Sequence, residues 1–362
     1  MKILFIRYKK SKNILEGGEQ GSQKNYNVLS SIVGEENVET YYVHDESHKP
    51  RITDYVGVLC YFFKNYYYGL SPKRVREIVE KAKSFDLVFV DRSIFGIIAK
   101  RLKECDYKGR VVCFFHNVEL DYFKAKMKGW NPAKSLILHC VDKNDGYSCK
   151  YADKIITLNP RDSKRIKTLY NRDSDVMIPV AFADRYNRES YPSEMTRSKL
   201  QLLFLGAYFG PNNEGIEWFF NEVYPHVNVE VKIVGKGMDQ LRANYKIPEE
   251  VEVVNDAPDL EPYFENADMM VLPIFKGSGM KVKTCESLMY GKNIVATDEA
   301  LVGYDLDYKK MGGCCNTAKE FIDVINEISA NPRPRFNNYC RQVFLEKYTE
   351  KAVEKLFRQV LY

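Results

Sequence analysis

The chain has 362 residues, of which 45% are apolar and 28% charged, and 54 basic against 49 acidic side chains give a formal net charge of +5. This composition excludes a disordered or fibrous protein, and the length suits two α/β domains of roughly 170–190 residues each. The small basic excess is compatible with phosphate-bearing ligands or an anionic membrane surface, and it is too weak to indicate nucleic acid as a partner.

The cysteines and the apolar runs bear on the compartment in which the protein works. The nine cysteines include no pair with C-x-x-C spacing, so we expect neither a zinc site nor a disulfide framework. Reduced thiols are typical of the cytosol. The apolar run at residues 3–6 is too short for a signal peptide, and no run approaches the ~18 apolar residues of a membrane span. We therefore expect a cytoplasmic protein.

In the first half of the chain, short apolar runs alternate with helical patterns. Ser71-Pro72 and Asn159-Pro160 each combine an N-cap residue with a proline in the first turn of a helix. This alternation is typical of parallel sheets with crossover helices. The predicted strands are 3–6, 38–43, 87–90, 111–115 and 155–158, and the predicted helices include 23–32, 73–82 and 161–170.

A polar stretch at residues 178–198 separates this set from a second one. We predict an N-terminal domain at 1–180 and a C-terminal domain at 181–339, with a terminal helix at about 340–362 that packs back on the first. Doubly wound domains bind ligands at the carboxyl ends of their strands, so we expect the site in a cleft between the two. The second set of predicted strands is 202–205, 229–234, 251–254, 269–272 and 293–296.

The segment 269–291 carries the most specific chemical pattern. A buried strand ends at Pro273, the turn Gly277-Ser278-Gly279 follows, and a helix comes next. The open N–H groups and the dipole of a helix start favour an anion, and Lys281 and Lys283 add positive charge, so the pattern fits a diphosphate. Glu286 has a spacing suited to the ribose hydroxyls of a nucleotide. The simpler interpretation is an ordinary strand-to-helix turn with solvated lysines and a solvated glutamate.

This segment resembles the nucleotide-sugar site of the group 1 glycosyltransferases (family 4, GT-B fold). Glu286 matches the second glutamate of that family's motif, and residues 291–297 match the turn and strand that follow. Ser278, or Lys276 with a small shift, stands where the family has its first glutamate. The resemblance implies that sugar contacts come from the backbone of residues 277–280, and Ser278 is kept among the catalytic candidates.

Further motifs of the second half follow in the family's order: 203–206 with 211–219, then 231–237, 255–260 and 263–268. Many members offer an Arg and a Lys to the diphosphate where this chain has Ala207 and Asn213, which leaves that charge to Lys281 and Lys283. The resemblance implies donor contacts at Gly206, Gly235, Lys236, Ala257, Pro258, Gly277, Gly279, Met280, Lys281, Val282, Lys283 and Glu286.

In the first half, glycines and a histidine follow predicted strands. Gly17-Gly18 opens a glycine-rich loop, which could equally be a flexible surface turn; in the family a glycine pair here lies against the donor. His116 and Glu119 follow the strand 111–115. A lone histidine there is more often structural, whereas the resemblance implies that His116 hydrogen-bonds the sugar and that Glu119 orients the acceptor or His116. Asp91 ends the preceding strand, where a capped turn explains it as well as a place in the cleft.

An aromatic stretch at 61–68 precedes a basic one, including Lys73 and Arg74. Such a surface suits anionic lipid headgroups, which would place the protein peripherally at the inner face of a membrane. Core packing beside a solvated helix face is the simpler alternative. Because many relatives use lipid-linked acceptors, the resemblance implies a saccharide or lipid-linked oligosaccharide as acceptor.

The resemblance implies an α/β protein with the GT-B fold, in which two Rossmann-like doubly wound domains face a central cleft. It further implies a retaining glycosyltransferase that needs no metal and no cofactor and serves surface polysaccharide or glycan biosynthesis. Two alternatives stay open. A sugar-nucleotide epimerase would need two facing carboxylates, for which Glu119 and Asp121 are weak candidates. A non-catalytic nucleotide-sugar-binding subunit would explain the missing first glutamate.

Overall fold

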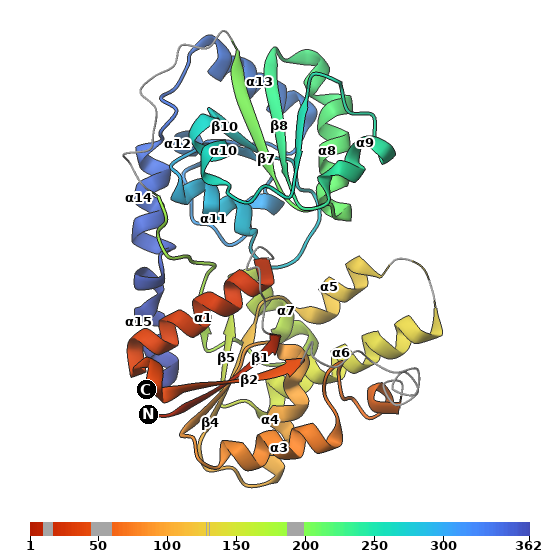
Figure 1. The fold of residues 1–362 in the computed structure, drawn as a ribbon, viewed down its shortest axis with the longest axis vertical. Helices are drawn as coiled ribbons and strands as arrows, with labels where there is room; N and C mark the ends of the chain where they lie inside the picture. Colours follow the sequence, from red (N-terminus) through yellow and green to blue (C-terminus); the bar gives the residue numbers. More distant parts are fainter. Residues whose placement is uncertain (10–16, 45–59, 128, 130, 187–198) are drawn as a thin grey trace. The chain divides into compact units, whose positions relative to one another are not determined.

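The computed structural model describes residues 1–9, 17–44, 60–127, 129, 131–186 and 199–362, which form two compact units. Met1–Ala181 together with Glu350–Tyr362 make the N-terminal unit, and Phe182–Thr349 make the C-terminal unit. Each unit is built on one six-stranded sheet in which every neighbouring pair is parallel (Figure 1). The α/β expectation is therefore confirmed.

The N-terminal sheet has the strand order β2-β1-β3-β4-β5-β6, so the chain reverses its direction of winding between β1 and β3. Such a reversal leaves a crevice at the carboxyl ends of the two strands beside it. The strands are β1 (Ile3–Lys9), β2 (Val38–His44), β3 (Leu87–Val90), β4 (Arg110–Phe115), β5 (Lys154–Thr157) and β6 (Val176–Met177).

Local sequence signals start the helices of this unit as expected. Ser71 accepts a hydrogen bond from the Arg74 N–H at 3.2 Å ahead of α3, and Asn159 accepts one from the Asp162 N–H at 3.0 Å ahead of α7. The helices are α1 (Gly17–Val33), α3 (Pro72–Ala82), α4 (Gly96–Glu104), α5 (Glu119–Lys126), α6 (Pro132–Tyr151), α7 (Pro160–Tyr170) and the terminal α15 (Glu350–Leu361).

The C-terminal sheet has the order β12-β11-β10-β7-β8-β9, with its reversal between β7 and β10. The strands are β7 (Leu200–Leu205), β8 (Val229–Gly235), β9 (Glu252–Asn255), β10 (Met269–Leu272), β11 (Asn293–Ala296) and β12 (Gly312–Cys314). The helices are α8 (Gly210–Glu222), α9 (Leu241–Asn244), α10 (Glu261–Asn266), α11 (Val282–Met289), α12 (Tyr308–Met311), α13 (Ala318–Ala330) and α14 (Asn338–Lys347).

The end of the chain differs from the single terminal helix that we predicted. Two helices stand there, and the first, α14, packs on α11 within the C-terminal unit. The break falls at Tyr348 and Thr349: Phe182 donates its N–H to the Tyr348 carbonyl at 3.0 Å and forms a parallel bridge with Thr349. Tyr348 has left the helical conformation, with a φ of −125° and a ψ of 17°, and α14 ends there.

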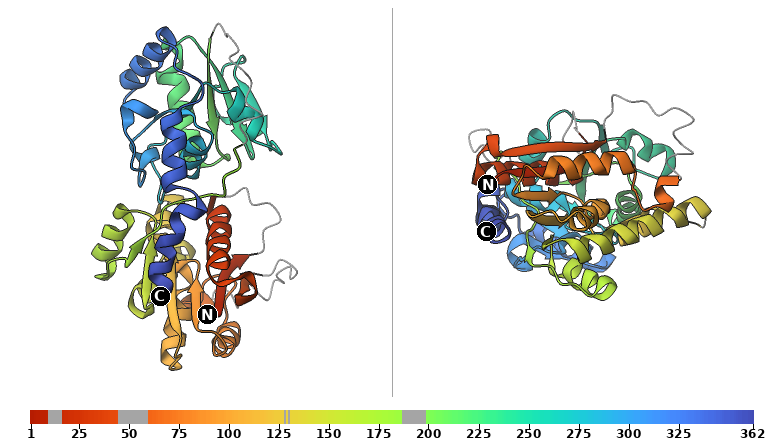
Figure 2. Two further views of the ribbon diagram at one scale, coloured as in Figure 1. Left: turned by 90° about the vertical axis from the view of Figure 1, so that its left-hand side faces the viewer. Right: turned by 90° about the horizontal axis from the view of Figure 1, so that it is seen from below.

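After the break, α15 packs on α1 in the N-terminal unit (Figures 1 and 2). Lys24 of α1 is buried, with its ammonium 5.0 Å from the centre of the Phe114 ring and 5.1 Å from that of Phe357 in α15. Asn27 donates to the Glu350 carboxylate at 2.9 Å. Among the described residues, no helix combines the length and the apolar character needed to span a bilayer.

Candidate functional site

In the C-terminal unit, the loops at the carboxyl ends of β7 and β8 are held together through their backbones. The Gly206 N–H donates to the Val234 carbonyl at 3.0 Å, and the Tyr208 N–H donates to the Lys236 carbonyl at 2.8 Å. A Cβ built on Gly235 would stand 1.9 Å from the Gly206 carbonyl oxygen, so only glycine allows this approach. These loops open on the reversal point of the sheet.

The loop after β10 leads into α11 beside that point. Gly279 has a φ of 62°, a left-handed conformation that favours glycine. Lys281 is the N-cap residue and its side chain makes no capping hydrogen bond. The loop is anchored by Tyr304, whose hydroxyl donates to the Lys281 carbonyl at 2.8 Å. The start of α11 thus has the polarity that favours a bound anion.

The two lysines at this helix start have different partners. The Lys281 ammonium lies 2.7 Å from the Glu299 carboxylate and 3.2 Å from the Gly279 carbonyl oxygen. The Lys283 ammonium lies 2.7 Å from the Asn212 side-chain oxygen and 4.5 Å from the centre of the Phe204 ring. Burial, with Lys281 in addition, lowers the pKa of Lys283 to about 7, although the Glu286 carboxylate acts in the opposite direction.

Glu286 lies one turn further along α11 and is buried, with 6% of its surface exposed. Its carboxylate is 3.8 Å from the Arg185 guanidinium. Burial of a carboxylate is costly unless charges or hydrogen bonds compensate for it. The simple interpretation of Glu286 as part of a solvated helix face is therefore wrong.

In the N-terminal unit, a buried network joins the carboxyl ends of β3 and β4 to α1. The Asp91 carboxylate is fully buried and accepts from the Asn25 amide at 2.7 Å and from the Ser22 hydroxyl. His116 Nε2 lies 3.3 Å from the same carboxylate. Burial would raise the pKa of Asp91, but His116, Ser22 and Asn25 outweigh it and the pKa lies below its usual value.

Burial lowers the pKa of His116 despite the opposing effect of Asp91. A neutral imidazole whose Nε2–H donates a hydrogen bond to the Asp91 carboxylate satisfies both groups. Its Nδ1 is then a hydrogen-bond acceptor. The ring is held in place because its proton-bearing nitrogen faces a carboxylate fixed by two further donors.

Comparison with protein families gives a match within the C-terminal unit. Residues 199–331 match the family model described as "Glycosyl transferases group 1". The C-terminal unit, which contains this stretch, therefore resembles the group 1 glycosyltransferases. A comparison with curated proteins finds no match.

Solved structures similar to this protein cover nearly the whole chain. The lipopolysaccharide outer core galactosyltransferase WaaB is 14% identical with a TM-score of 0.67, over 100% of this chain and 99% of that one. The sucrose-phosphate synthase of Thermosynechococcus elongatus is 13% identical with a TM-score of 0.71, over 99% of both chains. HepE of Anabaena in complex with UDP-glucose is 12% identical with a TM-score of 0.64, over 100% and 99%. At such low identity these likenesses show the fold, which confirms the GT-B expectation.

Several of the predicted donor-binding residues lie on adjoining loops. The Asp256 N–H donates to the Gly235 carbonyl at 3.3 Å, which brings the loop of Ala257 and Pro258 next to that of Lys236. Ala257 is buried and Pro258 is exposed. Ser278 and Val282 are partly exposed, Met280 is buried, and Gly277 lies against the Lys281 side chain. Their contact with a donor remains a prediction.

The glycine-rich segment at Gly17 and Gly18 is helical, and the expected loop followed by a helix from residue 23 is wrong at that point. Gly18 and Gly21 share one face of α1. A Cβ on Gly18 would lie 2.8 Å from the Arg92 guanidinium, and one on Gly21 would lie 2.9 Å from His116 Nδ1. The glycines therefore allow two side chains of the sheet edge to pack against the helix, which the sequence pattern did not reveal.

Glu119 begins α5 and is buried, and burial raises the pKa of its carboxyl to about 7. Its Oε1 has no hydrogen-bond partner among the described residues. Asp145 of α6 is buried close enough for Glu119 to raise its pKa further, although burial contributes most. Sequence reasoning missed Asp145, whose only signal is a polar Asn144-Asp145 pair within a helix.

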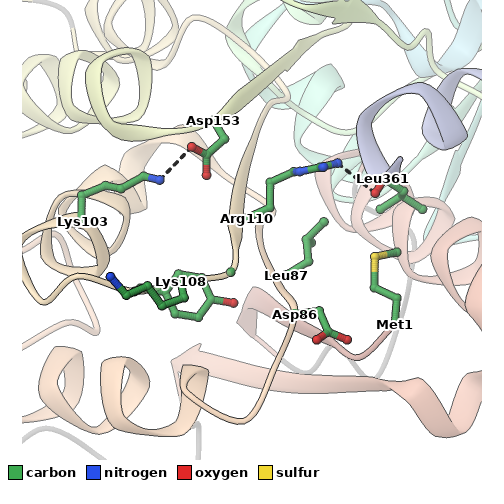
Figure 3. Close-up of a pocket in the computed structure, with 10 residues that line it drawn as sticks. Met1, Asp86, Leu87, Lys103, Lys108, Arg110, Asp153 and Leu361 are labelled. Carbon is green, nitrogen blue, oxygen red and sulfur yellow. Dashed lines mark hydrogen bonds and ion pairs between the residues drawn. The ribbon is translucent and has the colours of Figure 1, made fainter.

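A cavity of about 600 Å³ lies at the amino ends of the strands of the N-terminal sheet, opposite the carboxyl ends that hold Asp91 and His116 (Figure 3). Its lining includes Met1, Leu87 and Arg110, at the amino ends of strands. Its polar groups are bonded to protein: Lys103 to Asp153 at 2.7 Å and Arg110 to the Leu361 carbonyl at 2.9 Å. None of the predicted site residues lines it, so we do not assign the donor site there.

Proposed function

We propose that the protein transfers a sugar from a nucleoside diphosphate sugar, held by the C-terminal unit, to a hydroxyl of a saccharide or lipid-linked acceptor. The observation that carries this proposal is the arrangement at the start of α11. Three features lie near the carboxyl ends of β7 and β10, where the sheet reverses its winding. They are an N-cap without a side-chain acceptor, the Lys283 ammonium beside Gly206, and the buried Glu286. Ligands of doubly wound sheets bind at such points.

The diphosphate would lie over the start of α11, with Glu286 binding the ribose hydroxyls. The amides and the dipole of the helix would stabilise the negative charge that develops on the leaving diphosphate. In the transfer, the acceptor oxygen bonds to the anomeric carbon while the bond from that carbon to the phosphate oxygen breaks. The acceptor proton passes to the leaving phosphate, and attack on the face from which the diphosphate departs retains the configuration. We assign this charge stabilisation to protein groups and propose that no metal takes part.

His116 would accept a hydrogen bond from a sugar hydroxyl. This role is supported by the fixed imidazole, whose Nε2–H donates to the Asp91 carboxylate and whose Nδ1 is left as an acceptor. Glu119, buried close to the same strand end, would orient the acceptor or His116. Gly17 and Gly18, at the start of α1, would lie against the donor.

The printed names of two similar structures support a proposal for the donor and the cellular role. WaaB is named as a lipopolysaccharide outer core galactosyltransferase, and HepE has been solved with UDP-glucose. We propose that this protein likewise uses a uridine diphosphate sugar in the synthesis of a surface polysaccharide or glycan. The exposed Lys73 and Arg76 of α3, which share the solvent face of that helix with Glu77 and Glu80, would contact the inner surface of a membrane.

The test is a thermal-shift panel of UDP, GDP and ADP with their sugars, followed by turnover of the sugar that stabilises the protein. Glu286→Ala should lower turnover about tenfold or more, because the nucleotide is no longer positioned. Glu217→Ala is the matched control, since Glu217 is an exposed glutamate of α8. Near-normal activity of Glu286→Ala would remove that residue from the site.

The same assay separates the alternatives. Epimerisation of the donor sugar without any acceptor would indicate an epimerase. Binding without transfer or hydrolysis would indicate a non-catalytic subunit. Failure of every nucleotide to stabilise the protein would contradict the proposal itself.

A further inference from the structure

Lys281 and Lys283 differ in how far their charge is already compensated. The Lys281 ammonium forms an ion pair with Glu299 at 2.7 Å. No carboxylate of the described residues lies within ion-pair distance of the Lys283 ammonium, which has the neutral Asn212 amide and the Phe204 ring as its neighbours. Lys283 is therefore the lysine whose charge an incoming anion would compensate.

The Asn212 side chain is fixed at both ends. Its amide nitrogen donates to the Ala207 carbonyl at 2.8 Å, which orients its oxygen toward Lys283, and that oxygen accepts from the ammonium at 2.7 Å. Asn212 lies in the first turn of α8, so this contact ties α11 to the loop after β7. A flexible lysine side chain is thereby held in one place.

The position in which Lys283 is held is defined by a glycine. A Cβ on Gly206 would come within 2.9 Å of the Lys283 ammonium and within 2.8 Å of the Asn212 amide nitrogen. The ammonium thus lies directly over the backbone at the end of β7. The reversal point of the sheet, where a phosphate group would approach the chain, is at this strand end.

We infer that Lys283 recognises the diphosphate charge of the donor and that Asn212 is the positioning residue that holds it over Gly206. Lys281 is a structural member of the loop, paired with Glu299. This inference rests on the proposed nucleotide-sugar function and adds to it the division of labour between the two lysines and the role of Asn212.

The test measures affinities of UDP, GDP and ADP by titration calorimetry, and those of the corresponding nucleosides by competition. Lys283→Met should weaken diphosphate binding about tenfold to a hundredfold, as expected when a hydrogen bond to a charged group is lost, and leave nucleoside binding unchanged. Lys281→Met should cause a smaller loss. Lys319→Met is the control, because Lys319 is exposed in α13 of the same unit and paired with Asp323; it should change affinity less than about twofold.

Asn212→Asp separates positioning from mere structural support. The new carboxylate keeps an acceptor for Lys283, but it loses the donor to the Ala207 carbonyl and compensates the charge of the lysine. Diphosphate binding should therefore weaken several-fold, while nucleoside binding stays unchanged. Unchanged diphosphate affinity in Lys283→Met or in Asn212→Asp, with the wild type binding a diphosphate, would overturn the inference alone. If the wild type binds none of the three diphosphates, the proposed function fails with it.

Discussion

Raising the pH from 6 to 8 is expected to weaken the binding of a nucleoside diphosphate sugar about tenfold, because Lys283 loses its proton in this interval. Burial lowers the pKa of Lys283 to about 7 in the free protein. An anion at the ammonium favours the charged form and therefore raises that pKa in the complex. Binding then takes up a proton, and affinity falls as the pH rises through 7.

The magnitude follows from the fraction of Lys283 that is protonated. With a pKa of about 7 this fraction falls from about 0.9 at pH 6 to about 0.1 at pH 8, a change of about 1.4 kcal/mol if only the charged form binds the diphosphate. A sugar-linked diphosphate is the suitable probe, since the terminal phosphate group of a free phosphate ester itself titrates near a pKa of about 6.

The assay is titration calorimetry at several pH values, each in two buffers of different ionisation enthalpy, which reports the protons taken up. Lys283→Arg is the control, because a guanidinium stays charged throughout this range and its affinity should not vary with pH. Lys292 also has a pKa lowered to about 7 by burial, but its ammonium donates to the Ala267 carbonyl at 3.0 Å. An affinity that is constant from pH 6 to 8, or a pH dependence that survives in Lys283→Arg, would refute the reasoning.

Three further outcomes are expected in the N-terminal unit. Asp91→Asn should lower turnover about tenfold or more, because His116 loses the carboxylate that fixes its proton on Nε2; ¹⁵N chemical shifts of the imidazole should show the altered tautomer, and an unaltered tautomer would contradict this. Gly96→Ala should destabilise the protein by about 1–3 kcal/mol in denaturant titrations, since the new Cβ would stand 2.0 Å from a carbonyl oxygen of α6. The pKa of Glu119 is raised to about 7 in the folded protein, above the value of about 4.3 that an exposed glutamate has. Its contribution to stability is therefore fully present below about pH 4.3 and is lost as the pH rises through 7. Glu119→Gln should make melting temperature less dependent on pH between 5 and 8, and an unchanged slope would argue against it.

The strands could be predicted from the sequence where they are short runs of mostly apolar residues. Residues 87–90, 269–272 and 293–296 were predicted as strands and coincide with β3, β10 and β11, which are buried on both faces. β12 was missed, because a three-residue strand of Gly312–Cys314 carries no apolar periodicity. The break at Tyr348 was missed for a similar reason: the residue with which it pairs, Phe182, is far away in the sequence.

The candidate residues of the C-terminal unit could be predicted more fully from the sequence than those of the N-terminal unit. The Gly277-Ser278-Gly279 turn, the two lysines and Glu286 are consecutive in sequence, and local spacing already indicates an anion site at a helix start. In the N-terminal unit, Asp91, His116 and Ser22 are distant in sequence, and nothing local links a histidine after one strand to a carboxylate after another. Only their meeting in the buried network identifies Asp91 as the group that orients His116.

By itself the sequence determined the alternation of strands and helices, the α/β class and the family pattern of residues 199–331, since periodicity, caps and glycine turns are properties of neighbouring residues. Only the tertiary structure decided which charges are compensated. Lys281 and Lys283 are two residues apart and chemically identical, yet Glu299 neutralises the first and Asn212 holds the second. The physical reason is that a side chain's charge and pKa depend on what the fold brings within a few ångströms of it.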